Sequence, residues 1–435
     1  MVPINLEGFK RYFVNTSWLL GHRVLSMVVA LFVGVYVARY LGPEKFGLLN
    51  YAASFVSLFA ALATLGLDGI IVRELIKAPE HGNELLGTVF CLKAGGAVLM
   101  WIAIAVAVPF THNDTQTNIL IVIIAFAVIL QAFNVIDLNY QAEVKSKYVV
   151  YAQLVSLITS SIAKLVFVWT GAPLVWFACV FLLDAFVQAM GLLAVYLKNT
   201  GKIWYWRWKW QTAKTLLSDS WPLILSGMVI AIYMKIDQVM IKEMLDASAV
   251  GNYAAAVRLS EAWYFIPMAI TSSVFPAIIN AKKQSEELYN QRLQKLYDLM
   301  VWLSLSIAIP TTFLAPRVIK LLYGQAFLPA AGVLSIHIWA GVFVFLGCAS
   351  GKWLLTENLQ IFSTINTSIG AILNIILNYI LIKKIGINGA AISTLISYFI
   401  AAYFCLFFFE RTRINFIKLT KSLCLKGIFS VKENS

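Results

Sequence analysis

The chain has 435 residues, of which 60% are apolar and only 13% are charged. A water-soluble domain carries about 25% charged residues, so this composition excludes an ordinary soluble protein. A transmembrane helix uses about 20 residues, and the chain therefore has room for about a dozen spans. Lys and Arg outnumber Asp and Glu by 34 to 21. In a membrane protein this excess is typical of cytoplasmic loops, and we expect no nucleic-acid partner.

Twelve apolar runs are separated by charged clusters, glycine and proline. Each is close to the length of a membrane-spanning helix, and none alternates apolar and polar residues as a barrel strand does. The sequence therefore predicts an all-α integral membrane protein with about 12 transmembrane helices. The expected spans are 13–37, 46–67, 88–110, 118–138, 148–170, 174–197, 216–241, 253–279, 296–314, 330–355, 361–382 and 387–409.

The distribution of Lys and Arg outside these spans predicts the orientation of the chain. Twenty-two of them fall on the side of the N-terminus and seven on the opposite side. Basic loops stay in the cytoplasm, so we expect both termini to be cytoplasmic. No small-residue cleavage site follows the first run, and we expect no removable signal peptide.

An internal repeat indicates two halves of six helices each. The turn Leu41–Gly47 reads LGPEKFG, and 204 residues later Leu245–Gly251 reads LDASAVG, with Leu and Gly at both ends. Parallel repeats of this kind pack as two bundles around an axis along the membrane normal. We therefore expect a V-shaped transporter with a central cavity. The predicted parts are an N-terminal bundle (1–197), a basic aromatic linker (198–215), a C-terminal bundle (216–409) and a basic cytoplasmic tail (410–435).

Three segments resemble a known family: 38–52 (ARYLGPEKFGLLNYA), 65–74 (LGLDGIIVRE) and 321–327 (LLYGQAF). They are similar to polysaccharide-repeat-unit flippases, which include the bacterial O-antigen flippases. The superfamily also contains multidrug extruders and the lipid II flippases, which typically carry two further spans that this sequence lacks. The resemblance covers nearly the whole chain, and the turn 41–47 is its most specific part.

The resemblance implies a non-enzymatic activity in the bacterial inner membrane. The substrate is an undecaprenyl-diphosphate-linked oligosaccharide, moved from the cytoplasmic to the outer leaflet by alternating access, with coupling to an ion gradient as an open question. The alternative is a multidrug or cation antiporter of the same superfamily. A scaffold or polymerase in glycan assembly is a more distant reading. Expected partners are the lipid-linked oligosaccharide, membrane lipid and glycan polymerase or other assembly proteins.

Eight ionisable side chains fall within the expected spans. Each costs about 2.5–3.5 kcal/mol at mid-membrane, so most of them should face protein or water rather than lipid. Lys93 lies near the inner end of its span and is expected to reach the interface. The set contains more bases than acids, which favours an anionic substrate over a cationic drug. The eight are Arg23, Lys93, Lys164, Asp184, Lys235, Asp237, Arg258 and Glu261.

Four of the bases, Arg23, Lys164, Lys235 and Arg258, are predicted to bind the diphosphate. Arg23 is the leading candidate because guanidinium donors suit bidentate phosphate contacts; a structural hydrogen-bond anchor and an interfacial position are its alternatives. Arg258 is expected at the depth of Asp237 on the neighbouring helix. An ion pair between these two residues has two interpretations. It holds the seventh and eighth spans together as a structural contact, or it belongs to the site that binds substrate or a coupling ion.

Three acids are candidates for coupling transport to an ion gradient: Asp184, Asp237 and Glu261. Asp184 lies close to mid-membrane, which suits a protonatable carboxylate. A static ion pair between Asp184 and Lys164 is an equally good reading. Asp237 and Glu261 belong to the charged cluster of the seventh and eighth spans.

Three asparagines are candidate ligands for sugar hydroxyls: Asn134 in the fourth span, and Asn374 and Asn378 in the eleventh. Hydrogen bonds between packed helices are the more ordinary reading of such residues. The four histidines show no metal-ligand spacing and no phosphate-binding glycine loop follows a strand, so we expect no metal, cofactor or catalytic residue.

Two segments outside the spans are predicted to lie at the membrane surface. Residues 204–210 alternate tryptophan with tyrosine or a base, which is typical of an interfacial anchor; a loading platform for the substrate is the alternative. Residues 411–432 combine six bases with scattered apolar residues, and this pattern favours a surface-lying segment over another span.

Overall fold

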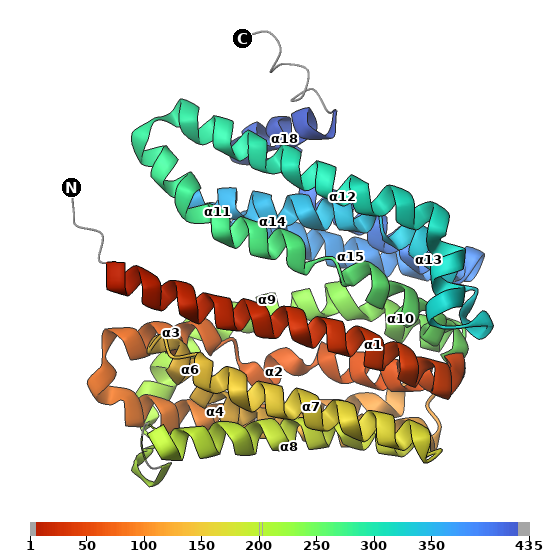
Figure 1. Ribbon diagram of the computed structural model, residues 1–435, viewed down its shortest axis with the longest axis horizontal. Coiled ribbons are helices and arrows are strands. Elements are labelled where there is room, and N and C mark those ends of the chain that lie inside the picture. The colour runs from red at the N-terminus through yellow and green to blue at the C-terminus, as the bar shows by residue number, and fades with distance from the viewer. Residues whose placement is uncertain (1–5, 200, 202, 425–435) are drawn as a thin grey trace. The chain divides into compact units, whose positions relative to one another are not determined.

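The computed structural model describes residues 6–199, 201 and 203–424. Within these ranges the regular structure is entirely helical (Figure 1), and eleven stretches are long and apolar enough to cross a membrane. The first stretch, Ser17–Leu58, overlaps two of the expected spans, 13–37 and 46–67, and Gly42 (φ 70°, ψ 173°) interrupts the helix between them. The predicted all-α membrane fold is confirmed.

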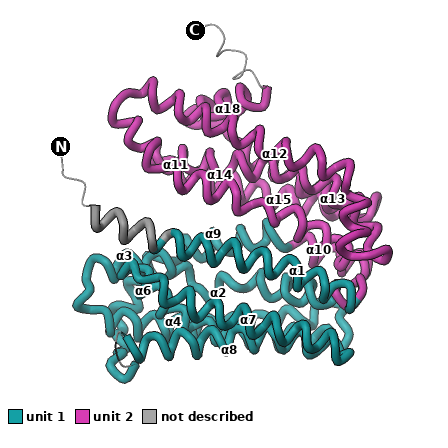
Figure 2. Tube along the Cα trace, in the orientation of Figure 1, with its two compact units in different colours: residues 1–41, 48–235 teal, residues 42–47, 236–435 magenta. Residues whose placement is uncertain are grey.

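The chain forms two compact units, which Figure 2 shows in different colours. Unit 1 comprises residues 1–41 and 48–235, and unit 2 comprises residues 42–47 and 236–435. The division after residue 235 falls inside a long helix, α9. The domain boundaries expected from the sequence repeat stay a prediction.

Unit 1 contains helices that pack as antiparallel and parallel neighbours, with α8 against both α5 and α7. Its elements are most of α1 (Leu6–Leu58), α2 (Ala60–Thr64), α3 (Asp68–Lys77), α4 (Gly82–Ala107), α5 (Thr115–Leu130), the 3₁₀ helix η3 (Gln131–Asn134), α6 (Val135–Ala142), α7 (Lys147–Trp169), α8 (Leu174–Asn199) and α9 (Trp210–Met244) up to residue 235. Short 3₁₀ turns occupy Pro79–His81, Val108–Phe110 and Ile203–Tyr205.

Unit 2 consists of residues 42–47 of α1 and of the chain from residue 236, in the last part of α9, onward. Its elements are α10 (Ala247–Glu261), α11 (Phe265–Gln284), α12 (Glu286–Leu322), a 3₁₀ turn (Gln325–Phe327), α13 (Ala330–His337), α14 (Ala340–Thr356), α15 (Gln360–Ile385), α16 (Ile387–Phe399), a π-helix (Ile400–Phe404), α17 (Cys405–Phe408) and α18 (Glu410–Leu423).

Helix ends follow from local sequence signals. Asp114, Asp246 and Ser285 each cap a helix, because their side chains accept a hydrogen bond from a backbone N–H in the first turn. Gly171 (φ 69°) and Gly386 (φ 62°) lie in the short connections between α7 and α8 and between α15 and α16. Both have the left-handed backbone conformation that glycine adopts without strain.

The two repeated turns pack against each other within unit 2. A Cβ atom on Gly47 would lie 1.7 Å from the Ala247 carbonyl oxygen, and one on Gly251 would lie 1.9 Å from the Pro43 carbonyl oxygen. Real Cβ atoms never come so close to other heavy atoms. The glycine that ends each copy of the repeat therefore permits the two backbones to meet.

Large apolar side chains cover much of the outer surface. Phe110 and Trp169 are each 83% exposed, and Phe313 is 79% exposed. A soluble protein rarely exposes so many large apolar groups, whereas a helix in a bilayer turns them toward lipid. The exposed surface therefore agrees with the expected membrane location.

Lys93 is buried and forms an ion pair. Its side chain is 6% exposed, and Nζ lies 2.5 Å from Oδ1 of Asp68, whose side chain is 55% exposed. Asp68 is the first residue of α3. It was not among the eight ionisable residues of the expected spans, because the second span was expected to end at residue 67. The ion pair removes Lys93 from the group of bases that could bind a substrate.

The aromatic linker docks on unit 1 through one of its tryptophans. Trp206 Nε1 donates to the Tyr196 hydroxyl at 3.0 Å, and its ring contacts Phe90. Trp204 and Trp210 are 87% and 69% exposed. The exposed rings are available to a membrane surface, as expected for an interfacial anchor.

The tail forms α18, which is too short to cross a membrane, and residues 425–435 of the expected segment lie outside the described residues. Its polar face packs inward: Asn415 accepts from the Tyr297 hydroxyl at 2.6 Å and donates to Ser350 at 2.8 Å. Ile414 and Ile417 are about half exposed. An apolar outer face suits a helix that lies on lipid.

Candidate functional site

A buried carboxylate, Asp237, lies at the centre of a hydrogen-bonded network in unit 2. Asn378 Nδ2 donates to its Oδ1 at 2.6 Å, and the hydroxyl groups of Tyr253 and Thr394 donate to its Oδ2 at 2.5 and 2.6 Å. Asn374 extends the network, because its Oδ1 accepts from Asn378 Nδ2 at 3.0 Å. We refer to these five residues, from α9, α10, α15 and α16, as the Asp237 network.

Protons in the Asp237 network can rearrange without movement of the heavy atoms. Thr394 Oγ1 lies 2.6 Å from Asp237 and 3.0 Å from the Ala390 carbonyl oxygen, and 3.2 Å from the Tyr253 hydroxyl. A threonine has one hydroxyl proton, so Thr394 donates to the carboxylate or to the carbonyl but not to both. The network can therefore follow a change in the charge of Asp237.

The negative charge of Asp237 has no basic partner in the part of the chain that the structure describes. Two amide atoms of the network, Asn374 Nδ2 and Asn378 Oδ1, are also buried without a hydrogen-bond partner. An isolated carboxylate is costly in a low-dielectric interior unless a proton or cation neutralises it. The oxygen atoms around Asp237 are suitable acceptors for either.

The expected ion pair between Asp237 and Arg258 is wrong. The turn between α9 and α10 lies earlier in the chain than the expected pairing of Asp237 with Arg258 requires. Asp246 caps α10, and the helix already begins at Ala247. Tyr253 consequently lies opposite Asp237, and Arg258 is more than a turn farther along α10. The guanidinium carbon of Arg258 instead lies 5.5 Å from the centre of the Phe46 ring.

Tyr253 and Thr394 were missed at the level of the sequence. Thr394 is 157 residues from Asp237, and spacing along one hairpin cannot detect such a partner. The run Ser393–Thr394 together with Ser397, in an otherwise apolar span, was the available signal. Glu261, by contrast, is the last residue of α10 and does not belong to the Asp237 network.

Two of the predicted phosphate ligands, Arg23 and Lys235, have no hydrogen-bond or ion-pair partner among the described residues. Arg23 is exposed and Lys235 is half-buried. Neither forms a hydrogen bond or an ion pair with another described residue. Two charges held in membrane-spanning helices without a counter-charge favour an anionic ligand.

Asp184 accepts a hydrogen bond from Ser156 Oγ at 2.6 Å. Lys164, its alternative partner in the sequence analysis, is half-buried eight residues farther along α7, which is about 12 Å at 1.5 Å per residue. The structure therefore places Asp184 beside a hydroxyl group at a level well removed from Lys164.

Asn134 lies at the end of η3, where a 3₁₀ turn replaces α-helical geometry. Such a turn has three residues per turn, so Gln131 and Asn134 share one face. Asn134 Oδ1 accepts from Gln188 Nε2 of α8 at 3.4 Å. This contact joins two packed helices, and Asn374 and Asn378 likewise serve an interhelical network rather than an open sugar site.

A family model described as "Polysaccharide biosynthesis protein" matches residues 13–282. The chain belongs to this family. The match includes all of the bases discussed above and Asp237, whereas Asn374, Asn378 and Thr394 lie beyond it.

Two relatives extend over most of the chain. The probable low-salt glycan biosynthesis flippase Agl15 of Haloferax volcanii is 23% identical over 84% of this chain and 77% of its own length. A candidate O-antigen transporter of Shigella flexneri is 24% identical over 87% of this chain and 93% of its own length. The fold resembles the inward-facing structure of a multidrug resistance MATE family transporter of the MOP superfamily, with a TM-score of 0.75 and 17% identity over 91% of this chain and 96% of that one.

Proposed function

We propose that the protein is a flippase that moves a polyprenyl-diphosphate-linked oligosaccharide from the cytoplasmic to the outer leaflet of the bacterial inner membrane. The observation that carries the proposal is the pairing of the intramembrane charges. Arg23 and Lys235 have no counter-charge among the described residues, whereas Asp184 and Asp237 both accept hydrogen bonds. Unpaired bases select an anion such as a diphosphate and disfavour a cationic drug.

The names of the two relatives support a glycan substrate, since one is a glycan biosynthesis flippase and the other an O-antigen transporter. The fold alone does not distinguish a glycan flippase from a multidrug transporter, because it resembles the fold of a multidrug transporter. In our proposal Arg23, Lys164, Lys235 and Arg258 contact the diphosphate in turn as the two halves alternate between inward and outward states. Both termini are cytoplasmic, and the product is passed to a glycan polymerase or another assembly protein.

Asp237 is the carboxylate that couples transport to an ion gradient. It is buried, it has no basic partner among the described residues, and four neutral polar side chains surround it. Binding of a proton or of Na⁺ removes the electrostatic cost of its negative charge and rearranges the hydrogen bonds of Thr394 and Asn378. Asp184 and Glu261 are the weaker candidates, because Asp184 is only half-buried and Glu261 ends its helix.

The deciding experiment reconstitutes the protein into liposomes with a fluorescent undecaprenyl-diphosphate oligosaccharide. Transfer between leaflets is followed with an imposed proton gradient, with an imposed sodium gradient and with neither. Gradient-dependent transfer is the expected result, and the active gradient identifies the coupling ion. No transfer, together with efflux of a cationic dye, would establish the multidrug alternative instead.

Variants test the role of the unpaired bases. Arg23→Gln and Lys235→Gln should each lower the transfer rate by about tenfold or more, since loss of a charged hydrogen bond costs about 1.5–3 kcal/mol. Lys283→Gln is the control, because Lys283 is an exposed base at the end of α11. Normal transfer by both Arg23→Gln and Lys235→Gln would refute the proposed phosphate contacts.

A further inference from the structure

α1 and α7 run side by side and in the same direction in unit 1. Near their first residues the Ser146 backbone N–H donates to Asn15 Oδ1 at 2.7 Å. At the other end the Tyr40 hydroxyl donates to the carbonyl oxygen of Ala172, just beyond α7, at 2.9 Å. These contacts define a long seam between the two helices, which we call the α1–α7 seam.

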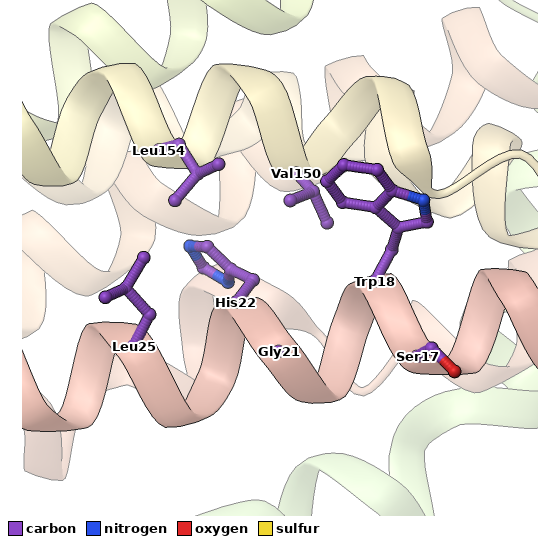
Figure 3. Close-up of a pocket in the computed structure, with 7 residues that line it drawn as sticks. All are labelled: Ser17, Trp18, Gly21, His22, Leu25, Val150 and Leu154. Carbon is purple, nitrogen blue, oxygen red and sulfur yellow. The ribbon is translucent and has the colours of Figure 1, made fainter.

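The first hollow on the α1–α7 seam has a volume of about 490 Å³. Trp18, His22 and Leu25 project from α1 toward Val150 and Leu154 of α7, and the wall they form is largely apolar (Figure 3). The volume is in the range of about 300–1,000 Å³ that small-molecule sites occupy. The hollow can therefore accept a segment of a hydrocarbon chain.

A cation lies beside Trp18, which lines the first hollow. Lys147 is the first residue of α7, and its Nζ lies 5.7 Å from the centre of the Trp18 ring and 5.8 Å from that of the Tyr151 ring. It forms no ion pair with a carboxylate among the described residues. An amine held over aromatic rings beside an apolar hollow is suited to the phosphate of a lipid.

The second hollow lies at the opposite end of the same two helices. Its volume is about 340 Å³, and Tyr36 of α1 forms it together with Ile162, Leu165, Val166 and Trp169 of α7. Val150 in the first hollow and Val166 in the second are 16 residues apart, which is about 24 Å along the helix. The hydrocarbon core of a bilayer is about 30 Å thick, so the pair of hollows extends into both leaflets.

The surface between the hollows is also apolar. Ile158 of α7 is 56% exposed and Phe32 of α1 is 66% exposed. An acyl chain of a phospholipid reaches only one leaflet, whereas a polyprenyl chain is long enough to follow the seam through both. This length favours the lipid of the substrate over a resident phospholipid as the occupant.

We propose that the α1–α7 seam binds the polyprenyl chain of the transported lipid, with Lys147 contacting its diphosphate at the cytoplasmic end. The proposal rests on the proposed flippase function and adds to it a site for the hydrophobic part of the substrate. The chain stays against the protein while the sugar headgroup crosses, which keeps the substrate attached during the conformational change. The walls of both hollows are mainly apolar, so the seam does not select among sugars.

The test is photo-crosslinking of the whole protein in lipid nanodiscs with undecaprenyl diphosphate that carries a diazirine in its chain. We expect labelled peptides from α1 and α7, and an excess of unlabelled undecaprenyl diphosphate should remove the label. An excess of phosphatidylglycerol should leave it. Equal competition by phosphatidylglycerol would show an ordinary lipid contact and overturn the proposal, as would labelling confined to other helices.

Substitutions that fill the hollows give a second readout. Leu154→Trp and Ile162→Trp each fill space that the lipid chain would occupy and remove part of its contact with the seam, so labelling should fall about tenfold. Ile372→Trp on α15 is the control, because Ile372 is 61% exposed and belongs to unit 2. Lys147→Gln should weaken labelling and Lys147→Arg should restore it. Unchanged labelling in both filled variants would contradict the proposal.

The crosslinking result is independent of transport, so the two proposals can fail separately. A labelled seam in a protein that transfers no oligosaccharide would retain the chain site and refute the flippase. Transfer at a normal rate with no label on α1 or α7 would retain the flippase and refute the chain site.

Discussion

Replacement of Asp237 by asparagine should uncouple transport from the ion gradient while leaving the protein folded. In Asp237→Asn, Asn378 can turn its amide so that Oδ1, which lacks a partner in the wild type, accepts from the substituted side chain. Asn374 then turns its own amide, so that its Nδ2 donates to Asn378 Oδ1 in place of the present bond from Asn378 Nδ2 to Asn374 Oδ1. One buried hydrogen bond then replaces another, and we expect the free energy of unfolding to change by less than about 1 kcal/mol. The variant cannot gain or lose a negative charge.

Asp237→Ala provides a graded comparison. Tyr253 can still donate to Thr394, at 3.2 Å, and Thr394 to the carbonyl oxygen of Ala390, at 3.0 Å. Only one N–H of Asn378 loses its acceptor, so the free energy of unfolding should fall by about 1–3 kcal/mol. The alanine variant should therefore be less stable than both the wild type and the asparagine variant.

Thermal unfolding in detergent, with and without Na⁺ and at several pH values, measures both effects. A ligand at 100 times its dissociation constant stabilises the folded protein by about 2.7 kcal/mol, and this gain should be present in the wild type and absent from Asp237→Asn. Asp184→Asn is the matched control and should keep the response. If Asp237→Asn retains gradient-driven transfer in liposomes, the assignment of the coupling carboxylate is wrong.

Three further predictions concern stability. Gly47→Ala should prevent accumulation of folded protein, because its methyl group would overlap a carbonyl oxygen. Gly95→Ala is the control and should fold normally, since nothing lies within 4 Å of the added atom. The yield of each variant after size-exclusion chromatography measures the difference. Asp68→Asn should destabilise by about 1–3 kcal/mol because the buried amine of Lys93 loses its charged hydrogen-bond acceptor, whereas Lys93→Met should be nearly neutral; equal thermal shifts would contradict this asymmetry. Asn415→Ala should loosen α18, cost about 1–3 kcal/mol and make the tail more sensitive to limited proteolysis; unchanged cleavage would show that other contacts hold the helix.

The helices were predictable from the sequence because each apolar run must satisfy its backbone hydrogen bonds within itself in a membrane. The glycine connections at Gly171 and Gly386 were predictable for a local reason as well, since a tight turn needs a residue with left-handed freedom. The partners of Asp237 were not. They depend on where α10 begins, and a cap at Asp246 shifts that start enough to replace Arg258 by Tyr253.

Long-range contacts explain the other differences. Asn378 and Thr394 approach Asp237 from helices 141 and 157 residues away, and no spacing along the chain reveals which face of one helix meets which face of another. The partner of Lys93 was missed for the same reason, because Asp68 belongs to a helix that lay between two expected spans. The sequence therefore identified which polar and ionisable residues lie in the spans, but only the tertiary structure showed which of them are partners.

The contact between the two repeated turns has a mechanical consequence. Residues 42–47 belong to unit 2, although the chain on both sides of them belongs to unit 1. Together with the passage at residue 235, the polypeptide therefore crosses between the units three times, and two of these crossings are only six residues apart. A short loop held at both ends behaves as a tether, so relative movement of the units must be accommodated by torsion at Gly42 and Gly47 or by bending of α9. Stiffening the backbone at Gly42 should slow the movement without altering any residue that contacts a substrate.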